Sequence, residues 1–274
     1  MKAYELESRL SKITAEAKSE ARFILEELFG VSYSELVLNK DREYDSERLN
    51  EVLFLREQGE PLQYILGKWY FMDSSFVVSP KCLIPRADTE ILVYEAIRLL
   101  KSEGCVADLC TGSGCIGLSM LKHRGDISSA VLADISSDAL EVAVQNARAL
   151  GVYDKCIFIN CDITKGLPEG KLDMIVSNPP YIPTSDIETL SKEVKREPRL
   201  ALDGGDDGLD IIRPLVDLAP NHLNKDGYLL IEFGYDQEDA ISALMDEKVK
   251  SGAYKSYKIL KDYGGNPRVL VAQV

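Results

Sequence analysis

The sequence predicts an α/β protein in which a Rossmann-like domain follows a small all-helical domain. Residues 1–68 carry apolar side chains at helical spacing, and from Thr89 onward helical and strand-like segments alternate. A glycine-rich turn follows the first strand-like segment of the alternating part. Such alternation is typical of a mostly parallel sheet with helices on both faces. Of the 274 residues, 45% are hydrophobic, which suffices for a core without disulfide or metal staples.

Residues 1–68 are expected to form the helical domain. Ser32 is followed three residues later by Glu35, the pattern of a capping box at a helix start. A further helix is expected over residues 46–58, and residues 61–67 are expected to add a short one. The first helical stretch is marked by apolar residues spaced three and four apart, namely Leu6, Leu10, Ile13, Ala17, Ala21, Ile24, Leu25 and Leu28.

Residues 69–84 are expected to form a β-hairpin linker, because two short runs of aromatic and β-branched residues flank a turn there. The Rossmann-like domain is expected to span residues 85–274. Its expected strands are 105–109, 129–133, 157–160, 172–177, 227–233, 254–260 and 268–274. Its expected helices are 89–100, 115–122, 137–150, 208–219 and 237–247. Ligands of such sheets bind at the carboxyl ends of the strands.

Charge and composition narrow the possible functions. The 45 acidic and 32 basic residues give a net charge of −13, which argues against extended binding of nucleic acid. The acidity is compatible with a basic protein partner or a cationic cofactor, and equally with a need for solubility alone. No apolar run reaches the roughly 20 residues of a membrane helix, and the N-terminus lacks the apolar segment of a signal peptide, so a cytoplasmic location is expected. The six cysteines form no CxxC pair, so reduced core cysteines are expected and no metal site.

A glycine turn predicts the first half of a ligand site. Gly112, Gly114 and Gly117 form a GxGxxG pattern between a strand and a helix, where the backbone can approach an anionic group closely. Asp134 ends the next strand, 20 residues after Gly114, and an acidic residue there can accept both hydroxyls of a ribose. The pattern favours a ligand that contains adenosine. On this pattern alone, NAD and a glycine turn without any ligand remain alternatives.

A second motif ends the expected strand over residues 172–177 and indicates the chemistry. Asn178-Pro179-Pro180-Tyr181 offers the side-chain carbonyl of Asn178 and the backbone carbonyl of Pro179 as acceptors for two N–H groups. Two prolines fix φ and remove competing donors, and Tyr181 offers a flat face to a planar group. A conjugated nitrogen is a poor nucleophile that must be oriented, so positioning accounts for most of the catalysis and no strong base is needed. Together the two motifs predict an S-adenosylmethionine-dependent methyltransferase acting on a planar nitrogen.

Over nearly its whole length, the chain resembles the protein-(glutamine-N5) methyltransferases that modify peptide-chain release factors, the HemK/PrmC family. Besides the two motifs above, the matching stretches are residues 60–67, 83–90, 197–202, 207–209, 230–232 and 262–264. The resemblance implies the class I S-adenosylmethionine-dependent methyltransferase fold and a helical N-terminal domain that helps to bind the substrate. It also implies that the substrate is the glutamine of the Gly-Gly-Gln motif of class 1 release factors.

The resemblance assigns roles to individual residues. For the cofactor, it implies contacts from Cys110, Thr111, Gly112, Ser113 and Gly114, ribose binding by Asp134, and adenine between Asp162 and Ile163. For the substrate glutamine, it implies binding by Asn178, Pro179, Pro180 and Tyr181, of which Asn178, Pro179 and Tyr181 are expected to be catalytic and Asn178 also lies near the cofactor. Arg86 is expected to close over the site. The chain departs from the family at Cys110, where glycine is usual, and at Ile163, where an aromatic residue is frequent.

Four other functions stay open at this stage. Nucleic-acid methyltransferases of adenine or cytosine amino groups use a similar motif, and other family-like enzymes methylate a glutamine in a ribosomal protein. A nucleotide-binding module without catalysis and an NAD oxidoreductase are compatible with the glycine turn. Release factors are the expected partners of a chain that we expect to be monomeric and to bind neither membrane nor nucleic acid directly.

Overall fold

The computed structural model describes residues 1–274 and divides them into two compact units. The first unit comprises residues 1–68 together with 191–196, and the second comprises residues 69–190 and 197–274. The hairpin expected over residues 69–84 is present as a two-stranded sheet of its own, and residues 69–84 fall within the second unit.

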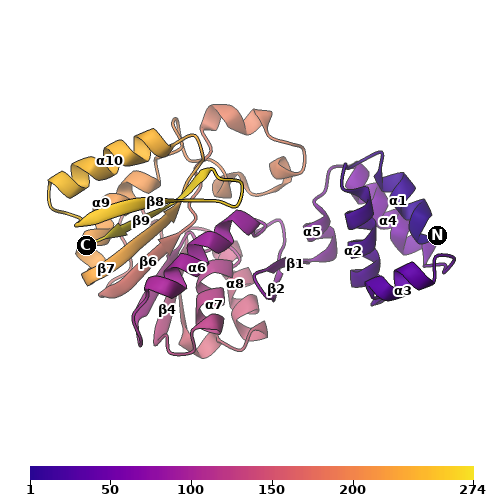
Figure 1. The fold of residues 1–274 in the computed structure, drawn as a ribbon, viewed down its shortest axis with the longest axis horizontal. Helices are drawn as coiled ribbons and strands as arrows, with labels where there is room; N and C mark the ends of the chain where they lie inside the picture. Colours follow the sequence, from indigo (N-terminus) through magenta and orange to yellow (C-terminus); the bar gives the residue numbers. More distant parts are fainter. The chain divides into compact units, whose positions relative to one another are not determined.

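The first unit is helical, as the sequence predicts (Figure 1). Its helices are α1 Ala3–Leu10, α2 Ala17–Phe29, α3 Tyr33–Leu38, α4 Ser46–Glu57 and α5 Leu62–Leu66. The expected capping box is present at α3, where the Ser32 amide donates to Glu35 Oε2 at 2.9 Å and the Glu35 amide donates to Ser32 Oγ at 3.3 Å. Arg56 is buried among these helices and forms an ion pair with Glu20 and a second with Glu193 at 2.9 Å. A cation that is paired on both sides is compatible with burial in so small a core.

The second unit contains a seven-stranded sheet in the order β5-β4-β3-β6-β7-β9-β8 (Figure 1). The hairpin strands are β1 Lys68–Phe71 and β2 Ser74–Val77, and the sheet strands are β3 Cys105–Leu109, β4 Ser129–Asp134, β5 Cys156–Asn160, β6 Leu172–Ser177, β7 Leu223–Glu232, β8 Ser256–Lys261 and β9 Pro267–Gln273. The first five strands of the sheet run parallel, and β9 inserts antiparallel between β7 and β8. The predicted α/β class is confirmed, and the parallel strands place their carboxyl ends along one edge.

Helices cover both faces of this sheet. The helices are α6 Glu90–Leu99, α7 Cys115–His123, α8 Ser137–Ala149, α9 Ile212–His222 and α10 Glu238–Lys250. Alternate side chains of each strand point to opposite faces, so Val106 packs with α6, α7 and α8 whereas Ala107 packs with α9 and α10. Both residues are fully buried, which explains why the central strands are almost continuously apolar.

The helix expected over residues 208–219 begins later, at Ile212. Gly208 has φ of +75° and lies against the end of the Asn178–Tyr181 segment. The residues from Gly208 to Ile211 therefore form a turn that packs on that segment, and the helix begins only after them. The strand expected from Gly227 begins earlier, at Leu223, because a register irregularity in its pairing with β6 lets it continue.

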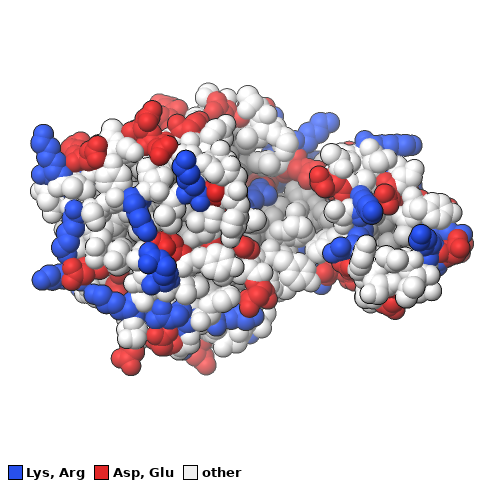
Figure 2. All heavy atoms as spheres, viewed as in Figure 1, with Lys and Arg blue, Asp and Glu red and all other residues white.

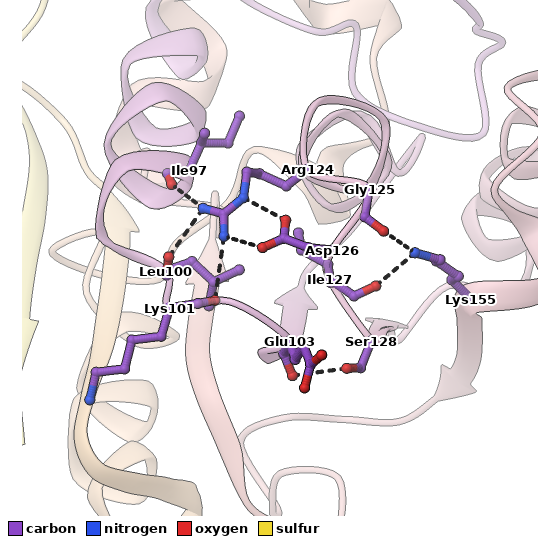
Figure 3. A network of polar contacts seen from close by, with 10 residues as sticks. All are labelled: Ile97, Leu100, Lys101, Glu103, Arg124, Gly125, Asp126, Ile127, Ser128 and Lys155. Atoms are coloured by element: carbon purple, nitrogen blue, oxygen red, sulfur yellow. Dashed lines mark hydrogen bonds and ion pairs between the residues drawn. The ribbon is translucent and has the colours of Figure 1, made fainter.

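Arg124, which follows α7, stabilises the structure near the amino ends of the parallel strands (Figure 3). Its guanidinium donates to the carbonyls of Ile97 and Leu100 at 2.8 and 3.1 Å, at the end of α6, and to both carboxylate oxygens of Asp126 at 2.7 Å. Carbonyl groups at a helix end lack intrahelical partners, so a cation satisfies them there. Lys155 binds the carbonyls of Gly125 and Ile127 in the same region.

None of the helices combines the length and apolar character needed to cross a bilayer. On the face drawn in Figure 2, acidic and basic side chains are interspersed, and no continuous basic stripe is visible there.

Candidate active site

A cavity of about 1030 Å³, open to solvent, lies at the carboxyl ends of the central parallel strands. It is formed within the second unit and has mostly apolar walls. Of the residues singled out in the sequence, it is lined by Arg86, Cys110, Thr111, Gly112, Ser113, Asp134, Asp162, Ile163, Asn178 and Pro180. Gly114, Pro179 and Tyr181 do not line it. The fold therefore brings both sequence motifs to one place, although they are more than sixty residues apart in the chain.

The glycine turn and the acidic strand end are joined directly. The Gly112 amide donates to Asp134 Oδ2 at 2.8 Å, and the Ser136 amide donates to Asp134 Oδ1 at 2.9 Å. Burial raises the pKa of Asp134 above its usual range, and these two amides oppose the shift. Each oxygen keeps a further lone pair, so the carboxylate is oriented and can still accept two hydroxyl groups.

The other two glycines of the motif serve packing rather than ligand contact. Gly114 has φ of +82° at the start of α7, and a Cβ there would come 2.8 Å from Leu118 and 3.3 Å from Ala143. Gly117 donates its amide to Asp108 Oδ2 at 2.9 Å, and a Cβ would lie 3.1 Å from the same oxygen. Helix α7 can therefore approach β3 closely because Gly117 lacks a side chain, whereas Gly114 leaves room for Leu118 and Ala143.

Asp108 supports the glycine turn from inside the protein. Its carboxyl group is fully buried and accepts the Thr111 hydroxyl at 2.6 Å as well as the Gly117 amide. Burial raises the pKa of Asp108 to about 7, against the effect of these two donors. The carboxyl group thus fixes the position of the turn without facing the cavity.

Cys110 occupies a strained backbone position at the cavity wall. Its φ is +58°, in the left-handed region that costs a residue with a Cβ roughly 1–2 kcal/mol. The thiol lines the cavity, and burial, reinforced by Asp134, raises its pKa, so the group stays a neutral thiol. Cys110 therefore presents a small, uncharged surface to a ligand.

One side of the cavity has aliphatic walls. Ile163 is buried at its edge, and Ile135, directly after Asp134, is half exposed and also lines it. Asp162 is a half-buried carboxylate whose pKa is lowered to about 2, first by Lys165 and then by Thr164. It accepts the Thr164 hydroxyl at 2.6 Å and contacts Lys165 at 2.8 Å. Ile135 and Ile163 thus provide an apolar surface on this side of the cavity.

The Asn178–Tyr181 segment is anchored at both ends. Asn178 Nδ2 donates to the Thr89 hydroxyl at 3.2 Å, which leaves the other end of its amide, Oδ1, free to accept. Tyr181 donates its hydroxyl to Glu232 Oε1 at 3.3 Å, and its ring packs against the core on the α9 face. Burial raises the pKa of Tyr181 above its usual range, so its hydroxyl remains a donor.

Gln237 and residues 203–204 also contact the Asn178–Tyr181 segment. Gln237 Nε2 donates to the Tyr181 carbonyl at 2.9 Å, and Ile182 forms a parallel bridge with Asp203. A Cβ at Gly204 would lie 2.7 Å from Tyr181 Cα and 2.8 Å from the Pro180 carbonyl oxygen. The motif is thus fixed by its connection to the end of β6 and by these contacts.

Arg86 lines the cavity and is paired with Glu197, whose side chain is almost completely buried. Glu197 Oε2 also accepts the Ile84 amide at 3.0 Å. Burial raises the pKa of Glu197, and Arg86 opposes that shift. Arg86 therefore has a fixed position at the rim rather than a free side chain.

Among the residues that sequence reasoning missed and that the structure connects to the site are Thr89, Ile135 and Glu232. Thr89 and Glu232 lie in stretches that resemble the family, but no chemical role could be read from their spacing. Ile135 follows Asp134 directly, and this position at a strand end was the one feature of the sequence that could have indicated its place in the cavity wall.

Comparisons with known proteins agree with this geometry. A family model described as PrmC N-terminal domain matches residues 5–67, and one described as Methyltransferase small domain matches residues 88–197. A relative from Geobacter sulfurreducens named release factor glutamine methyltransferase is 39% identical over 229 residues, covering 82% of this chain and 80% of the relative. One of the same name from Moorella thermoacetica is 43% identical over 219 residues, covering 79% and 76%.

Among solved structures, a methyltransferase from Pyrococcus furiosus matches 98% of both chains with a TM-score of 0.52 and 18% identity, which is a likeness in fold. The predicted class I methyltransferase fold is thereby confirmed. On the extent and identity of its relatives, the chain belongs to the release factor glutamine methyltransferase family.

Proposed function

We propose that this enzyme transfers a methyl group from S-adenosylmethionine to the side-chain amide nitrogen, N5, of the glutamine in the Gly-Gly-Gln motif of class 1 release factors. The observation that carries the proposal is the position of Asn178-Pro179-Pro180-Tyr181 at the end of β6, where Asn178 and Pro180 line the same cavity as Asp134. The side-chain acceptor of Asn178 thus lines the same cavity as an oriented carboxylate that fits a ribose.

The residues of the cavity fit S-adenosylmethionine. Asp134 would bind the ribose hydroxyls, Ile135 and Ile163 would pack on the adenine, and the turn from Cys110 to Ser113 would hold the methionine part. The cavity walls are mostly apolar, which suits the adenine ring. When bound, the sulfonium group supplies an electrophilic methyl group.

The chain's own part in the reaction is to orient the glutamine amide. Asn178 Oδ1 and the Pro179 carbonyl accept the two N–H groups, which turns the nitrogen lone pair toward the cofactor side of the cavity. Pro179 and Pro180 lack amide hydrogens, so no backbone donor competes for these acceptors. Tyr181, held by its hydrogen bond to Glu232, would fix the end of the motif that presents these acceptors. Holding two groups in a reactive geometry contributes up to roughly 7–11 kcal/mol to a barrier.

The helical unit, residues 1–68, would bind the release factor outside the reacting glutamine. The family model for the N-terminal domain covers residues 5–67 of it. Its surface exposes several large apolar side chains, among them Tyr33, Val37, Leu38 and Phe54. Since release factors act in translation, we expect the enzyme to work in the cytoplasm.

The proposed function is tested by offering labelled S-adenosylmethionine with three substrates side by side: a class 1 release factor, ribosomal proteins and an adenine- and cytosine-containing oligonucleotide. We expect label in the release factor alone. Label in a ribosomal protein or the oligonucleotide instead would replace the proposed substrate. Equilibrium binding of S-adenosylhomocysteine and of NAD separates a methyltransferase from an oxidoreductase, because only the former is expected to bind the homocysteine product.

A further inference from the structure

Asn146, in α8, joins two segments of the chain that both lead to the cavity. Its Oδ1 accepts the Val77 amide at 2.7 Å, and its Nδ2 donates to the Val77 carbonyl at 3.0 Å and to the Ser113 carbonyl at 2.9 Å. Val77 is the last residue of β2, which lies beside α8 (Figure 1). One side chain, 1% exposed, is thus hydrogen-bonded to both the hairpin and the glycine turn.

The two ends of the Asn146 amide cannot be exchanged. Val77 presents both its N–H and its carbonyl to the side chain, so Oδ1 must meet the N–H and Nδ2 the carbonyl. The second hydrogen of Nδ2 is used on the Ser113 carbonyl. Loss of this side chain therefore removes a hydrogen bond from three backbone groups, and buried polar groups without a partner are costly.

The Ser113 carbonyl depends on Asn146 because helix α7 does not provide a donor for it. Ser113 precedes Gly114, the N-cap of α7, so its carbonyl lies outside the hydrogen bonds of that helix. The amide of Gly117, four residues after Ser113, donates to Asp108 Oδ2. The Ser113 end of the glycine turn is therefore held from α8 by Asn146.

The side chain of Ser113 is a second observation that points to a ligand. Ser113 lines the cavity and is 2% exposed, and its Oγ has no hydrogen-bond partner. The thiol of Cys115 lies near it, but thiols are weak partners. A buried hydroxyl without a partner is satisfied when a polar group of a ligand reaches it. The methionine part of the proposed cofactor carries two such groups, an amine and a carboxylate.

We propose that Asn146 is a positioning residue for the cofactor: it holds the Ser113 backbone against Val77 and so places the Ser113 hydroxyl at the polar end of the methionine part. This inference rests on the proposed function only for the identity of the cofactor. The chain continues from Val77 to Cys82 and Leu83, which also line the cavity, so the same side chain holds two parts of the cavity wall together.

The first test compares Asn146→Ala with Tyr254→Phe. Since Asn146 does not contact the Asn178–Tyr181 segment, we expect Asn146→Ala to raise the KM for S-adenosylmethionine roughly 10-fold and to leave kcat at saturating cofactor within about threefold. Tyr254→Phe is the matched control, because it removes a buried hydrogen bond of 2.9 Å to the Val216 carbonyl away from the cavity. It should lower stability without changing this KM. An equal rise in both variants, or a fall in kcat alone, would overturn the proposal.

A double-mutant cycle separates positioning of Ser113 from a general loss of stability. The Kd for S-adenosylhomocysteine is measured by calorimetry in Asn146→Ala, in Ser113→Ala and in the double variant. We expect Ser113→Ala to raise Kd about fivefold, Asn146→Ala roughly 10-fold, and the double variant no more than Asn146→Ala alone. Ser113→Ala keeps the backbone carbonyl, so effects that multiply would mean that Asn146 does not act through the Ser113 hydroxyl.

A measurement on the unsubstituted enzyme decides the matter even where Asn146→Ala fails to fold. Val77 does not line the cavity, but Asn146 connects it to the glycine turn. Bound S-adenosylhomocysteine should therefore slow hydrogen exchange of the Val77 amide more than that of the Lys255 amide, which donates to the Gln273 carbonyl. Equal slowing of the two amides would contradict the inference. If S-adenosylhomocysteine binds but release factor accepts no methyl group, the proposed function fails, and these measurements still decide the role of Asn146.

Discussion

Gly208 lies directly against the backbone carbonyl of Tyr181. A Cβ at Gly208 would overlap that carbonyl oxygen and also Nε2 of Gln237, which donates to it at 2.9 Å. The φ of Gly208 is +75°, so the position excludes side chains on conformational as well as steric grounds. A glycine 31 positions after the end of β6 in the chain thus determines where the substrate-orienting motif ends.

Replacement of Gly208 by alanine should therefore displace the motif. We expect Gly208→Ala to lower the free energy of unfolding by roughly 3 kcal/mol or more and to lower kcat more than cofactor affinity. Gly252→Ala is the matched control, because its φ is +81° but nothing lies within 4 Å of its added Cβ. Gly252→Ala should lower the free energy of unfolding by only about 1–2 kcal/mol and leave kcat unchanged. Equal effects of the two substitutions in denaturant titration would refute the overlap argument.

Cys110→Gly should remove strain without harming the cofactor site. The left-handed φ of +58° is free of cost for glycine, so we expect a gain of about 1 kcal/mol, offset in part by the greater freedom of the unfolded chain. Affinity for S-adenosylhomocysteine should stay equal or increase, because a side chain leaves the cavity wall. Glu103→Gly, at the same φ of 58° but outside the cavity, should show the stability gain alone. A loss of cofactor affinity in Cys110→Gly would mean that the thiol contributes to binding.

Asp134→Asn should weaken cofactor binding. Both carboxylate oxygens accept backbone amides, from Gly112 and Ser136, so an NH2 group at either position faces a donor and disrupts the turn. Hydrogen bonds to a charged group contribute about 1.5–3 kcal/mol, which predicts a roughly 10- to 100-fold higher Kd for S-adenosylhomocysteine by calorimetry. An unchanged Kd would remove Asp134 from the ribose site.

Arg124→Ala should reduce stability and leave the reaction alone. Its guanidinium satisfies carbonyls at the end of α6 and pairs with Asp126, at the edge of the sheet away from the cavity (Figure 3). We expect the free energy of unfolding, measured by denaturant titration, to fall by roughly 1–3 kcal/mol, with unchanged kcat. Arg22→Ala, which removes an exposed pair with Glu26, should cost at most about 0.5 kcal/mol. If Arg124→Ala lowered the free energy of unfolding no more than Arg22→Ala does, the contacts of Arg124 with these carbonyls would not contribute to stability.

The sequence predicted the fold and most of the residues of the cavity because their physical basis is local. Alternating patterns determine the strands, and the ends of parallel strands meet at one edge, so Gly112, Asp134 and Asn178 could be placed near each other in advance. The capping box at Ser32 and Glu35 is equally local, and it is present.

What could not be predicted depends on contacts between distant segments. The late start of α9 results from the packing of Gly208 against Tyr181, and helical periodicity carries no trace of that contact. Thr89 lies 89 positions before Asn178 and Glu232 lies 51 positions after Tyr181, and each contacts the motif only because the fold brings these segments together. The strain at Cys110 likewise follows from the backbone path of the folded turn, since a cysteine in a sequence does not reveal its φ.

The central claim is that Asn178 orients a substrate amide rather than holding the cofactor. Single-turnover transfer from labelled S-adenosylmethionine to a class 1 release factor, with product located by mass spectrometry, tests it in the unsubstituted enzyme and in Asn178→Ala. We expect one methyl group on the Gly-Gly-Gln glutamine, a rate lowered roughly 100-fold or more in Asn178→Ala, and a Kd for S-adenosylhomocysteine within about threefold of the original. Undiminished transfer by Asn178→Ala, or equal labelling of a release factor whose glutamine is replaced, would contradict the account.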